Sequence, residues 1–326
     1  MTCKSILQRI GFSQIPEHIS NQKLDKNEAK KWLKNIDFTD GIKFYNLDQH
    51  KNFINLFTRY YKQFSSNSDF KFGAYILNNL LFSPDKYNWT HNLKRDTVDA
   101  LPALVLISGY AQHHQNMQNK KFDSQQTETH KFRIFESCVR GIDIYNVAGS
   151  EISQLIWGSL FTNAHIVEFG RLQYEIMHYD YDIPNFINPD KFCINIHVPR
   201  GGKLLDSETQ ESLSTARKKI PSYFSFLPSQ PNYFIESWLM SDNLDKYLPK
   251  KSNIRLFRNH FDILKQEPQT TMSKFLFNTS SPDVSKYPSD TTLRKRIKQA
   301  LLDGEKFHDG IALLKQKKQI VLHPKR

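Results

Sequence analysis

Residues 191–220 read KFCINIHVPRGGKLLDSETQESLSTARKKI, and the change of pattern inside this stretch decides the fold. Residues 191–199 alternate between an apolar face and a polar face, with Phe192, Ile194, Ile196 and Val198 on the first and Cys193, Asn195 and His197 on the second. A period of two residues is typical of a β-strand. Two glycines then end the strand, and Asp206 or Ser207 can cap a helix whose first turns are acidic, where the helix dipole favours acid. The stretch therefore predicts a strand, a glycine loop and a helix in succession.

A second alternating segment, residues 166–178, precedes this strand. Arg171, Gln173 and Glu175 point to one side of it, and Leu172, Tyr174 and Ile176 to the other. Between the two segments, residues 179–189 contain the Asp, Pro and Asn residues that are typical of a turn. We expect an antiparallel hairpin with an apolar back and a polar front, which places Glu175 and His197 on the polar faces of its two strands.

The rest of the chain is predicted from its periodicity. The second half continues with a buried strand over residues 233–240, helices over 241–248 and 252–261, a strand over 274–278, a basic helix over 289–302, and strands over 308–314 and 319–322. The first half repeats apolar residues at helical spacing over residues 27–36, 47–64, 69–82, 96–119 and 127–147. The sequence therefore predicts an α/β (or α+β) protein, with a helical N-terminal domain over residues 1–150 and a mixed-sheet domain over residues 151–326.

Composition narrows the classes of protein that fit. The chain has 326 residues, 13% of them aromatic, which excludes a disordered chain and is long enough for two domains. The net charge of +12 favours an anionic partner, either nucleic acid, an acidic membrane surface or a phosphate-bearing cofactor. No apolar run is long enough to span a membrane, and the three cysteines form neither a disulfide framework nor a CxxC metal site. We expect a cytoplasmic protein.

The glycine loop, which comprises Arg200, Gly201, Gly202 and Lys203, is a candidate phosphate site. Two glycines allow the backbone to approach a ligand closely, and the helix that follows points free N–H groups at the loop. The spacing matches neither GxGxxG nor GxxxxGK[ST], so it is neither a dinucleotide-binding nor a P-loop fingerprint. The alternative is an ordinary strand-to-helix turn with solvated basic residues.

Several strings together resemble a known family. They are EFGRLQYE (168–175), INIHVPRGGKL (194–204), ESLSTA (211–216), FIESWLM (234–240) and SNIRLF (252–257). This run looks like the C-terminal domain of a GNAT-like acyltransferase family of Gram-positive bacteria, in which a helical N-terminal acyltransferase domain precedes a GNAT-like domain. The matched strings lie between Phe169 and Phe257, whereas the first half agrees only in its length and helical character.

The resemblance implies an enzyme that uses acetyl-CoA or another acyl-CoA as co-substrate and needs no metal. In that superfamily the strand before the loop and the helix after it hold the CoA pyrophosphate through backbone amides, which here implies Val198 and the glycine loop. The usual loop is [QR]-x-x-G-x-[GA], and this sequence departs from it. Asn253 is a candidate for the pantetheine arm, although capping a helix is the commoner role of such a residue.

Acylation of an amine needs a base for the ammonium proton and an acid for the leaving thiolate. We expect Glu175 and His197 to be the base, because a histidine titrates near neutral pH. Glu236 is a second carboxylate candidate, and Tyr247 lies in the helix where the superfamily often has its acid tyrosine. The alternative for each is an ordinary structural role, such as a salt bridge, a buried strand histidine or a surface carboxylate.

Other groups are weaker candidates. His113, His114 and His130 lack an acidic or cysteine partner at a spacing that suits zinc. The segment of residues 179–182 (YDYD) suits a hairpin tip better than a cation site. Cys193 points the same way as His197, which makes a thiol nucleophile stereochemically possible, but nothing in the sequence lowers its pKa.

Two functions follow as expectations. The first is an acyl-CoA-dependent transferase acting on an amine or hydroxyl of a small-molecule or peptide acceptor. The alternative is a non-catalytic GNAT-like protein whose basic surface, including residues 294–298, binds nucleic acid or another anionic partner. A hydrolase built on Glu175 and Glu236 has no supporting motif. An opening between the strands of Glu175 and His197 would favour the first function, and continuous pairing would favour the second.

Overall fold

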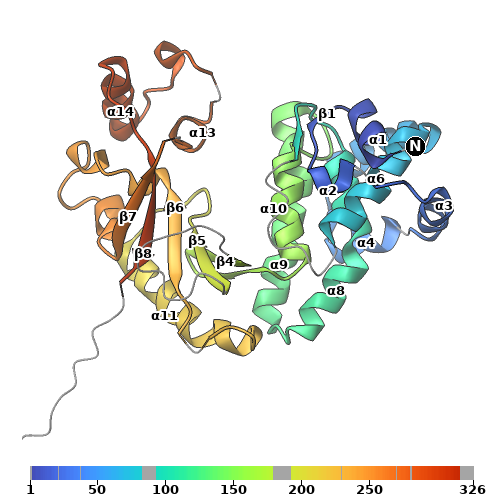
Figure 1. Cartoon of the computed structure of the whole chain (residues 1–326), viewed down its shortest axis with the longest axis horizontal. Coiled ribbons are helices and arrows are strands. Elements are labelled where there is room, and N and C mark those ends of the chain that lie inside the picture. Colours follow the sequence, from blue (N-terminus) through green and yellow to red (C-terminus); the bar gives the residue numbers. More distant parts are fainter. Residues whose placement is uncertain are drawn as a thin grey trace, which may run out of the picture. The chain divides into compact units, whose positions relative to one another are not determined.

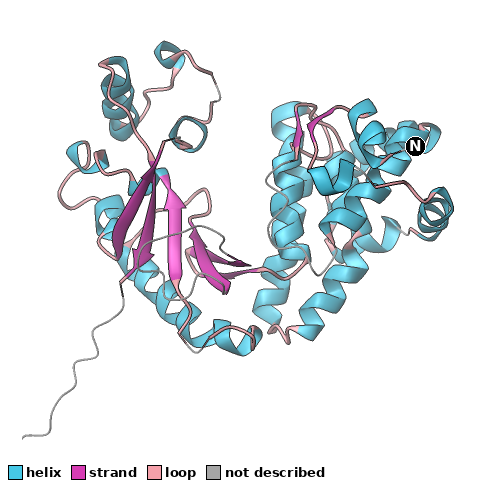
Figure 2. Cartoon of the chain, viewed as in Figure 1, coloured by secondary structure: helices cyan, strands magenta, loops and turns pink. Residues whose placement is uncertain are grey.

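The computed structural model describes residues 2–20, 22–36, 38–82, 93–178, 192–228, 230–268, 270–279 and 281–315. The chain divides into two compact units, Met1–Val167 and Glu168–Arg326. The first is mainly helical and the second is built on a sheet, as Figures 1 and 2 show. The prediction of an α/β (α+β) fold is therefore confirmed.

Unit 1 is a packed array of helices with one small antiparallel strand pair. Its elements are α1 (Cys3–Arg9), β1 (Phe12–Gln14), α2 (Glu17–Ser20), α3 (Lys26–Asn35), α4 (Phe38–Phe44), α5 (Lys51–Ser66), α6 (Ser68–Leu81), β2 (Lys94–Arg95), α7 (Leu101–Ser108), α8 (Tyr110–Asn119), α9 (Ser124–Tyr145) and α10 (Ile152–Thr162). The strands β1 and β2 pair with each other. Helix α7 is buried from Leu101 to Ile107 and packs against α6, α9 and α10, which makes it the centre of the unit.

The helix predicted over residues 96–119 is two helices, α7 and α8, and it begins later than expected. Pro102 stands in the first turn of α7, where its missing N–H leaves no helical bond unmade. Gly109 separates the helices, and a Cβ there would lie 2.5 Å from Cε2 of Phe82. The pattern of apolar residues runs through both helices, so periodicity alone could not reveal the break.

The sheet of unit 2 has the strand order β3-β4-β5-β6-β8-β7. Its elements, with the strand that leads into the unit, are β3 (Ile166–Phe169), β4 (Leu172–His178), β5 (Phe192–His197), α11 (Asp206–Tyr223), β6 (Tyr233–Ser237), α12 (Asn253–Arg258), β7 (Phe261–Glu267), α13 (Met272–Leu276), α14 (Thr292–Leu302) and β8 (Asp309–Leu314). β5 and β6 run parallel, whereas β4 with β5, β6 with β8, and β7 with β8 run antiparallel. The predicted hairpin of β4 and β5 is confirmed.

Helix α11 covers the apolar back of this hairpin. The Tyr174 hydroxyl lies 2.7 Å from Oγ of Ser212 on α11, and Ser212 in turn donates to the carbonyl of Phe169. Ile194 and Ile196 of β5 are buried on the same side. The opposite side of the hairpin presents Glu175 and His197, as the alternation predicts.

Five predicted elements of unit 2 differ from the structure. The strand over residues 233–240 ends at Ser237, and Trp238–Met240 form a 3-10 turn. The strand over residues 166–178 is broken at Gly170, whose φ of +56° lets the chain turn from β3 into β4. Residues 274–278 lie largely in helix α13, because a short apolar run fits either element. The helix over residues 252–261 ends at Arg258, and β7, which was not predicted, follows it. The helix over residues 241–248 is reduced to a short 3-10 turn, and the strand over residues 319–322 lies outside the described residues.

Candidate functional site

The pairing between β5 and β6 ends early. β5 pairs with β4 along its whole length, from Gln173 opposite His197 to His178 opposite Phe192. β5 and β6 pair only at Ile194 with Tyr233 and at Asn195 with Phe234, although both strands continue beyond these residues. In the described sheet, the facing edges of residues 196–197 and 235–237 therefore form an unpaired stretch, which we call the opening.

The strands of Glu175 and His197 pair continuously, which by itself is the outcome that favours the binding-protein alternative. The opening lies instead one strand further on, between β5 and β6, and it borders the strand that bears His197. Both strands that flank the opening remain bonded on their outer edges, β5 to β4 and β6 to β8. Because β5 and β6 are parallel, the opening faces their carboxyl ends, where open sheets of this kind bind ligands. The glycine loop follows directly from the carboxyl end of β5.

Arg171 fixes the orientation of the glycine loop. Its Nη2 donates to the carbonyl of Gly201 at 2.7 Å, and its Nε donates to the carbonyl of Lys203 at 3.1 Å. Gly201 and Gly202 have φ values of +80° and +66°, which favour glycine, and a Cβ on Gly201 would meet no heavy atom within 4 Å. The glycines are therefore required by the backbone conformation rather than by packing.

Free amides follow the loop at the start of α11. The first backbone bond of the helix runs from Thr209 N to Leu205 O, and Leu205 offers no side-chain cap. Among the described residues, the amides of Asp206, Ser207 and Glu208 have no acceptor. Such a set of N–H groups at the positive end of an 18-residue helix suits an anion such as a pyrophosphate.

Glu175 and His197 form a hydrogen-bonded pair, which we call the dyad. His197 Nε2 lies 2.8 Å from Glu175 Oε2. The Glu175 side chain is only 7% exposed and that of His197 is 25% exposed, so the carboxylate lies beneath the imidazole. A buried carboxylate that bonds one ring nitrogen orients the imidazole. An imidazole held in this way has the chemistry of a general base.

Glu236 lies on the same face of the sheet as the dyad. The parallel register of Asn195 with Phe234 places Glu236 level with His197, on the other side of the opening. Its side chain is exposed, unlike that of Glu175. The opening is therefore flanked by the dyad on β5 and β4 and by a solvated carboxylate on β6, strands that lie next to one another in Figure 1.

Tyr247 and Asn253 lie outside the strands of the sheet. Tyr247 packs against Phe307, with ring centroids 5.5 Å apart, and lines a surface cavity of about 290 Å³ with Arg296. Asn253 begins α12, whose N-cap is Ser252, so capping is done by its neighbour. The roles of acid for Tyr247 and of pantetheine contact for Asn253 stay predictions.

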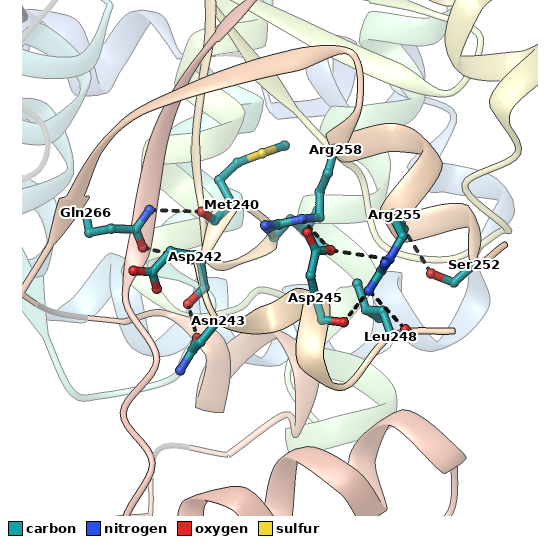
Figure 3. Close-up of polar contacts among 11 residues, drawn as sticks. Met240, Asp242, Asn243, Asp245, Leu248, Ser252, Arg255, Arg258 and Gln266 are labelled. Carbon is teal, nitrogen blue, oxygen red and sulfur yellow. Dashed lines mark hydrogen bonds and ion pairs between the residues drawn. The ribbon is translucent and has the colours of Figure 1, made fainter. Parts of the chain in front are cut away.

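The chain that follows β6 is held by a group of arginines. Asp245 lies 3.2 Å from Nε of Arg258 and 3.6 Å from Nε of Arg255, and Arg258 also donates to the carbonyl of Leu239. On the other side, Gln266 binds the backbone of Met240 and Asp242 (Figure 3). These contacts fix the turn that ends β6, and with it the edge of the opening that bears Glu236.

Cys193 is unsuited to the role of nucleophile. It is buried, its Sγ donates to the carbonyl of Met177 at 3.6 Å, and burial raises its pKa to about 12. Thiolate is the reactive form of cysteine, so almost none of it is present near neutral pH.

Two of the three candidate histidines of unit 1, His113 and His130, are buried in its core, whereas His114 is exposed. His113 Nδ1 bonds the hydroxyl of Tyr45 at 3.0 Å, and His130 Nδ1 bonds the carbonyl of Phe161 at 3.2 Å. In the described part of the chain, no group of three His, Cys, Asp or Glu side chains could hold a metal ion. The segment of residues 179–182 lies outside the described residues.

Three basic side chains of helix α14 donate hydrogen bonds to backbone carbonyls of unit 2. Arg294 donates to the carbonyl of Leu276 at 2.7 Å, Arg296 to that of Tyr247 at 3.1 Å, and Lys298 to those of residues 285 and 287 at 2.7 Å. These contacts give the three side chains a structural role, which weakens the case for a nucleic-acid surface on this helix.

Two features of the site were not found in the sequence. Arg171 is 30 residues from its partner Gly201, and nothing local distinguishes it from a surface arginine. Gln173, directly opposite His197, is buried and donates to Glu168 at 2.6 Å. The alternation of the strand places Gln173 on the polar face, which is the one signal that could have found it.

Comparison with solved structures gives the same fold over nearly the whole chain. An acyltransferase in complex with decanoyl-CoA and teicoplanin has a TM-score of 0.70 at 14% identity, covering 97% of this chain and 100% of the other. An acyltransferase in complex with decanoyl-CoA has a TM-score of 0.68 at 17% identity over the same shares. A mutant acyltransferase in complex with octanoyl-CoA has a TM-score of 0.67 at 14% identity, covering 96% and 94%.

Comparison with protein sequences locates the similarity in the second unit. No curated protein matches the sequence. Among the described helices, none is both long and apolar enough to cross a membrane. One family matches, the GNAT-like C-terminal domain, and it does so over residues 166–314. The strands, the opening, the glycine loop and the dyad all lie in this range, so the part of the chain that contains the candidate site is the part that matches the GNAT-like C-terminal domain.

Proposed function

We propose that the protein is an acyl-CoA-dependent acyltransferase that moves an acetyl or longer acyl group to an amine or hydroxyl of a small-molecule or peptide acceptor. The observation that carries the proposal is the opening between β5 and β6 beside a loop and helix start with free amides. The solved acyltransferases of the same fold, which contain decanoyl-CoA or octanoyl-CoA, support it.

In this proposal, Val198, the glycine loop and the first amides of α11 hold the CoA pyrophosphate. The charges of Arg200 and Lys203 add to the attraction for phosphate. The pantetheine arm lies in the opening, where its amides bond the unpaired backbone of β5, and Asn253 is a further candidate contact. The arm thus takes the place of a missing strand between β5 and β6.

The dyad acts as the general base. His197 accepts a proton from the acceptor amine, and the buried carboxylate of Glu175 stabilises the imidazolium that results. The amine nitrogen then forms a bond to the thioester carbon, the C–S bond breaks, and the departing thiolate takes up a proton. Glu236 and Tyr247 are the candidates for handling that proton.

We propose further that the two compact units are two domains, the first a helical acyltransferase domain. The three cysteines are free and buried, which suits a reducing compartment, and on that ground we propose a cytoplasmic location. A bacterial source is proposed from the resemblance of residues 169–257 alone.

A thermal-shift experiment tests the function. A ligand present at one hundred times its Kd stabilises a protein by about 2.7 kcal/mol. We expect acetyl-, octanoyl- or decanoyl-CoA to raise the melting temperature, with the acyl chain that fits best giving the largest rise. If no acyl-CoA shifts the melting temperature, and a single-stranded oligonucleotide does so in a salt-sensitive way, the binding-protein alternative replaces this proposal.

A further inference from the structure

An exposed aromatic ring lies beside the glycine loop. Phe275 of α13 is 48% exposed. The guanidinium carbon of Arg200 lies 5.7 Å from the centre of its ring, and Nζ of Lys274 lies 5.8 Å from the same point. An accessible ring flanked by two cations offers stacking to a base and charge to a phosphate, which is the chemistry that nucleotides require.

The ring is held in place by contacts at both ends of α13. At its start, the amide of Thr271 donates to both carboxylate oxygens of Asp309, at 2.9 and 3.1 Å. At its end, Arg294 Nε donates to the carbonyl of Leu276 at 2.7 Å. A helix of five residues has little stability of its own, so these bonds fix where Phe275 stands.

Arg200 connects the ring to the proposed pyrophosphate site. It is the first residue of the glycine loop, directly before Gly201, and its Nη2 lies 3.5 Å from the carbonyl of Lys274. A ligand on the amides of the loop therefore has the ring and both cations within reach of its next chemical group. In CoA, the group next to the pyrophosphate is an adenosine that bears a 3′-phosphate.

We propose that Phe275, Lys274 and Arg200 bind the adenosine 3′-phosphate end of CoA, with adenine on the ring and the 3′-phosphate on the cations. This inference rests on the proposed function and sharpens it. The protein then distinguishes free acyl-CoA from an acyl phosphopantetheine that is attached to a carrier protein, because the latter lacks the nucleotide.

Calorimetric titration with CoA, dephospho-CoA and 4′-phosphopantetheine tests the inference. Stacking of one base and one phosphate contact are each worth roughly a tenfold change in Kd. We expect the wild type to bind dephospho-CoA about tenfold more weakly than CoA, and phosphopantetheine more weakly still. Lys274→Gln should remove most of the difference in Kd between CoA and dephospho-CoA. Phe275→Ala should remove most of the difference in Kd between dephospho-CoA and phosphopantetheine.

Matched controls are Phe226→Ala and Lys251→Gln, an exposed phenylalanine and an exposed lysine of the same unit, which should leave all three constants unchanged. If the wild type binds the three compounds equally, the inference is refuted while acyl-CoA binding stands. If CoA does not bind even at millimolar concentration, the proposed function falls with it. If Phe275→Ala weakens binding of an oligothymidylate but not of CoA, the ring serves single-stranded nucleic acid and the inference is overturned.

Discussion

Replacing Arg171 by Gln tests whether the glycine loop is shaped in advance for an anion. Arg171 makes two hydrogen bonds to loop carbonyls, at 2.7 and 3.1 Å, and these turn the carbonyls of Gly201 and Lys203 toward the guanidinium. A hydrogen bond that involves a charged group contributes about 1.5–3 kcal/mol, and we take about 1 kcal/mol for each because the side chain is half-exposed. The loss of both bonds therefore removes about 2 kcal/mol of the free energy that favours the ordered loop over the disordered loop.

If the loop is ordered only part of the time in the free protein, the apparent Kd equals the intrinsic Kd divided by the ordered fraction. A loss of about 2 kcal/mol corresponds to a Kd for CoA raised by up to about 30-fold. Arg171→Lys keeps the charge but cannot bond both carbonyls with one planar group, so it should weaken binding nearly as much. The melting temperature of the free protein should change little.

Calorimetric titration with CoA gives the three dissociation constants. Arg217→Gln is the control, because Arg217 also donates to a distant carbonyl, that of Lys315 at 3.1 Å, and lies outside the loop. A Kd for Arg171→Gln equal to that of the wild type would refute the reasoning. If only the Gln variant were weakened and the Lys variant were not, charge rather than loop geometry would be the cause.

Three further predictions concern the dyad, the sheet and the core of unit 1. His197→Ala and Glu175→Gln should each lower the rate of thiol release from acyl-CoA in the presence of an acceptor by roughly 100-fold or more while CoA still binds; full activity in both would exclude the dyad as the base. Gly310→Ala should destabilise the protein by at least about 2 kcal/mol in denaturant unfolding, because its Cβ would lie 2.2 Å from the carbonyl oxygen of Met240; an unchanged midpoint would contradict the close approach. Burial lowers the pKa of His130 from 6.5 to about 4, so as the pH falls His130 is protonated in the unfolded chain before it is protonated in the folded protein. The free energy of unfolding should therefore fall by about 3 kcal/mol as the pH drops from above 6.5 toward 4. Urea unfolding at pH 7.5 and 4.5 measures the loss, which His130→Gln should reduce, and equal loss in both proteins would rule His130 out as its source.

The sequence predicted the hairpin of β4 and β5 because a period of two and a polar turn are local signals. The same alternation placed Glu175 and His197 on one face, and their contact at 2.8 Å follows from the register. The resemblance carried by strings between Phe169 and Phe257 predicted the GNAT-like domain that matches residues 166–314.

Other parts of the site depend on contacts between distant residues. The ladder of β5 and β6 ends after Asn195 and Phe234. Neither strand contains a residue whose type predicts that the pairing ends there. The bonds of Arg171 to the loop join residues about 30 positions apart. Helix α13 is fixed by Asp309 and Arg294, so its short apolar run fitted a strand equally well until those partners were known. Periodicity reports which residues share a face, but not where two strands part.

Because the ladder between β5 and β6 is short, the sheet consists of two groups of strands that few hydrogen bonds connect. In the described strands, β3, β4 and β5 form one blade and β6, β8 and β7 form another, and two residue pairs at one end join the blades. Each blade is held by its own antiparallel ladders, so its bonding does not depend on the joint. Helix α11 connects the two blades along the chain. The amide of Ile194 donates to Asn232 across the joint, whereas Ile235 pairs with Ala312 inside its blade. We therefore expect faster amide exchange at Ile194 than at Ile235.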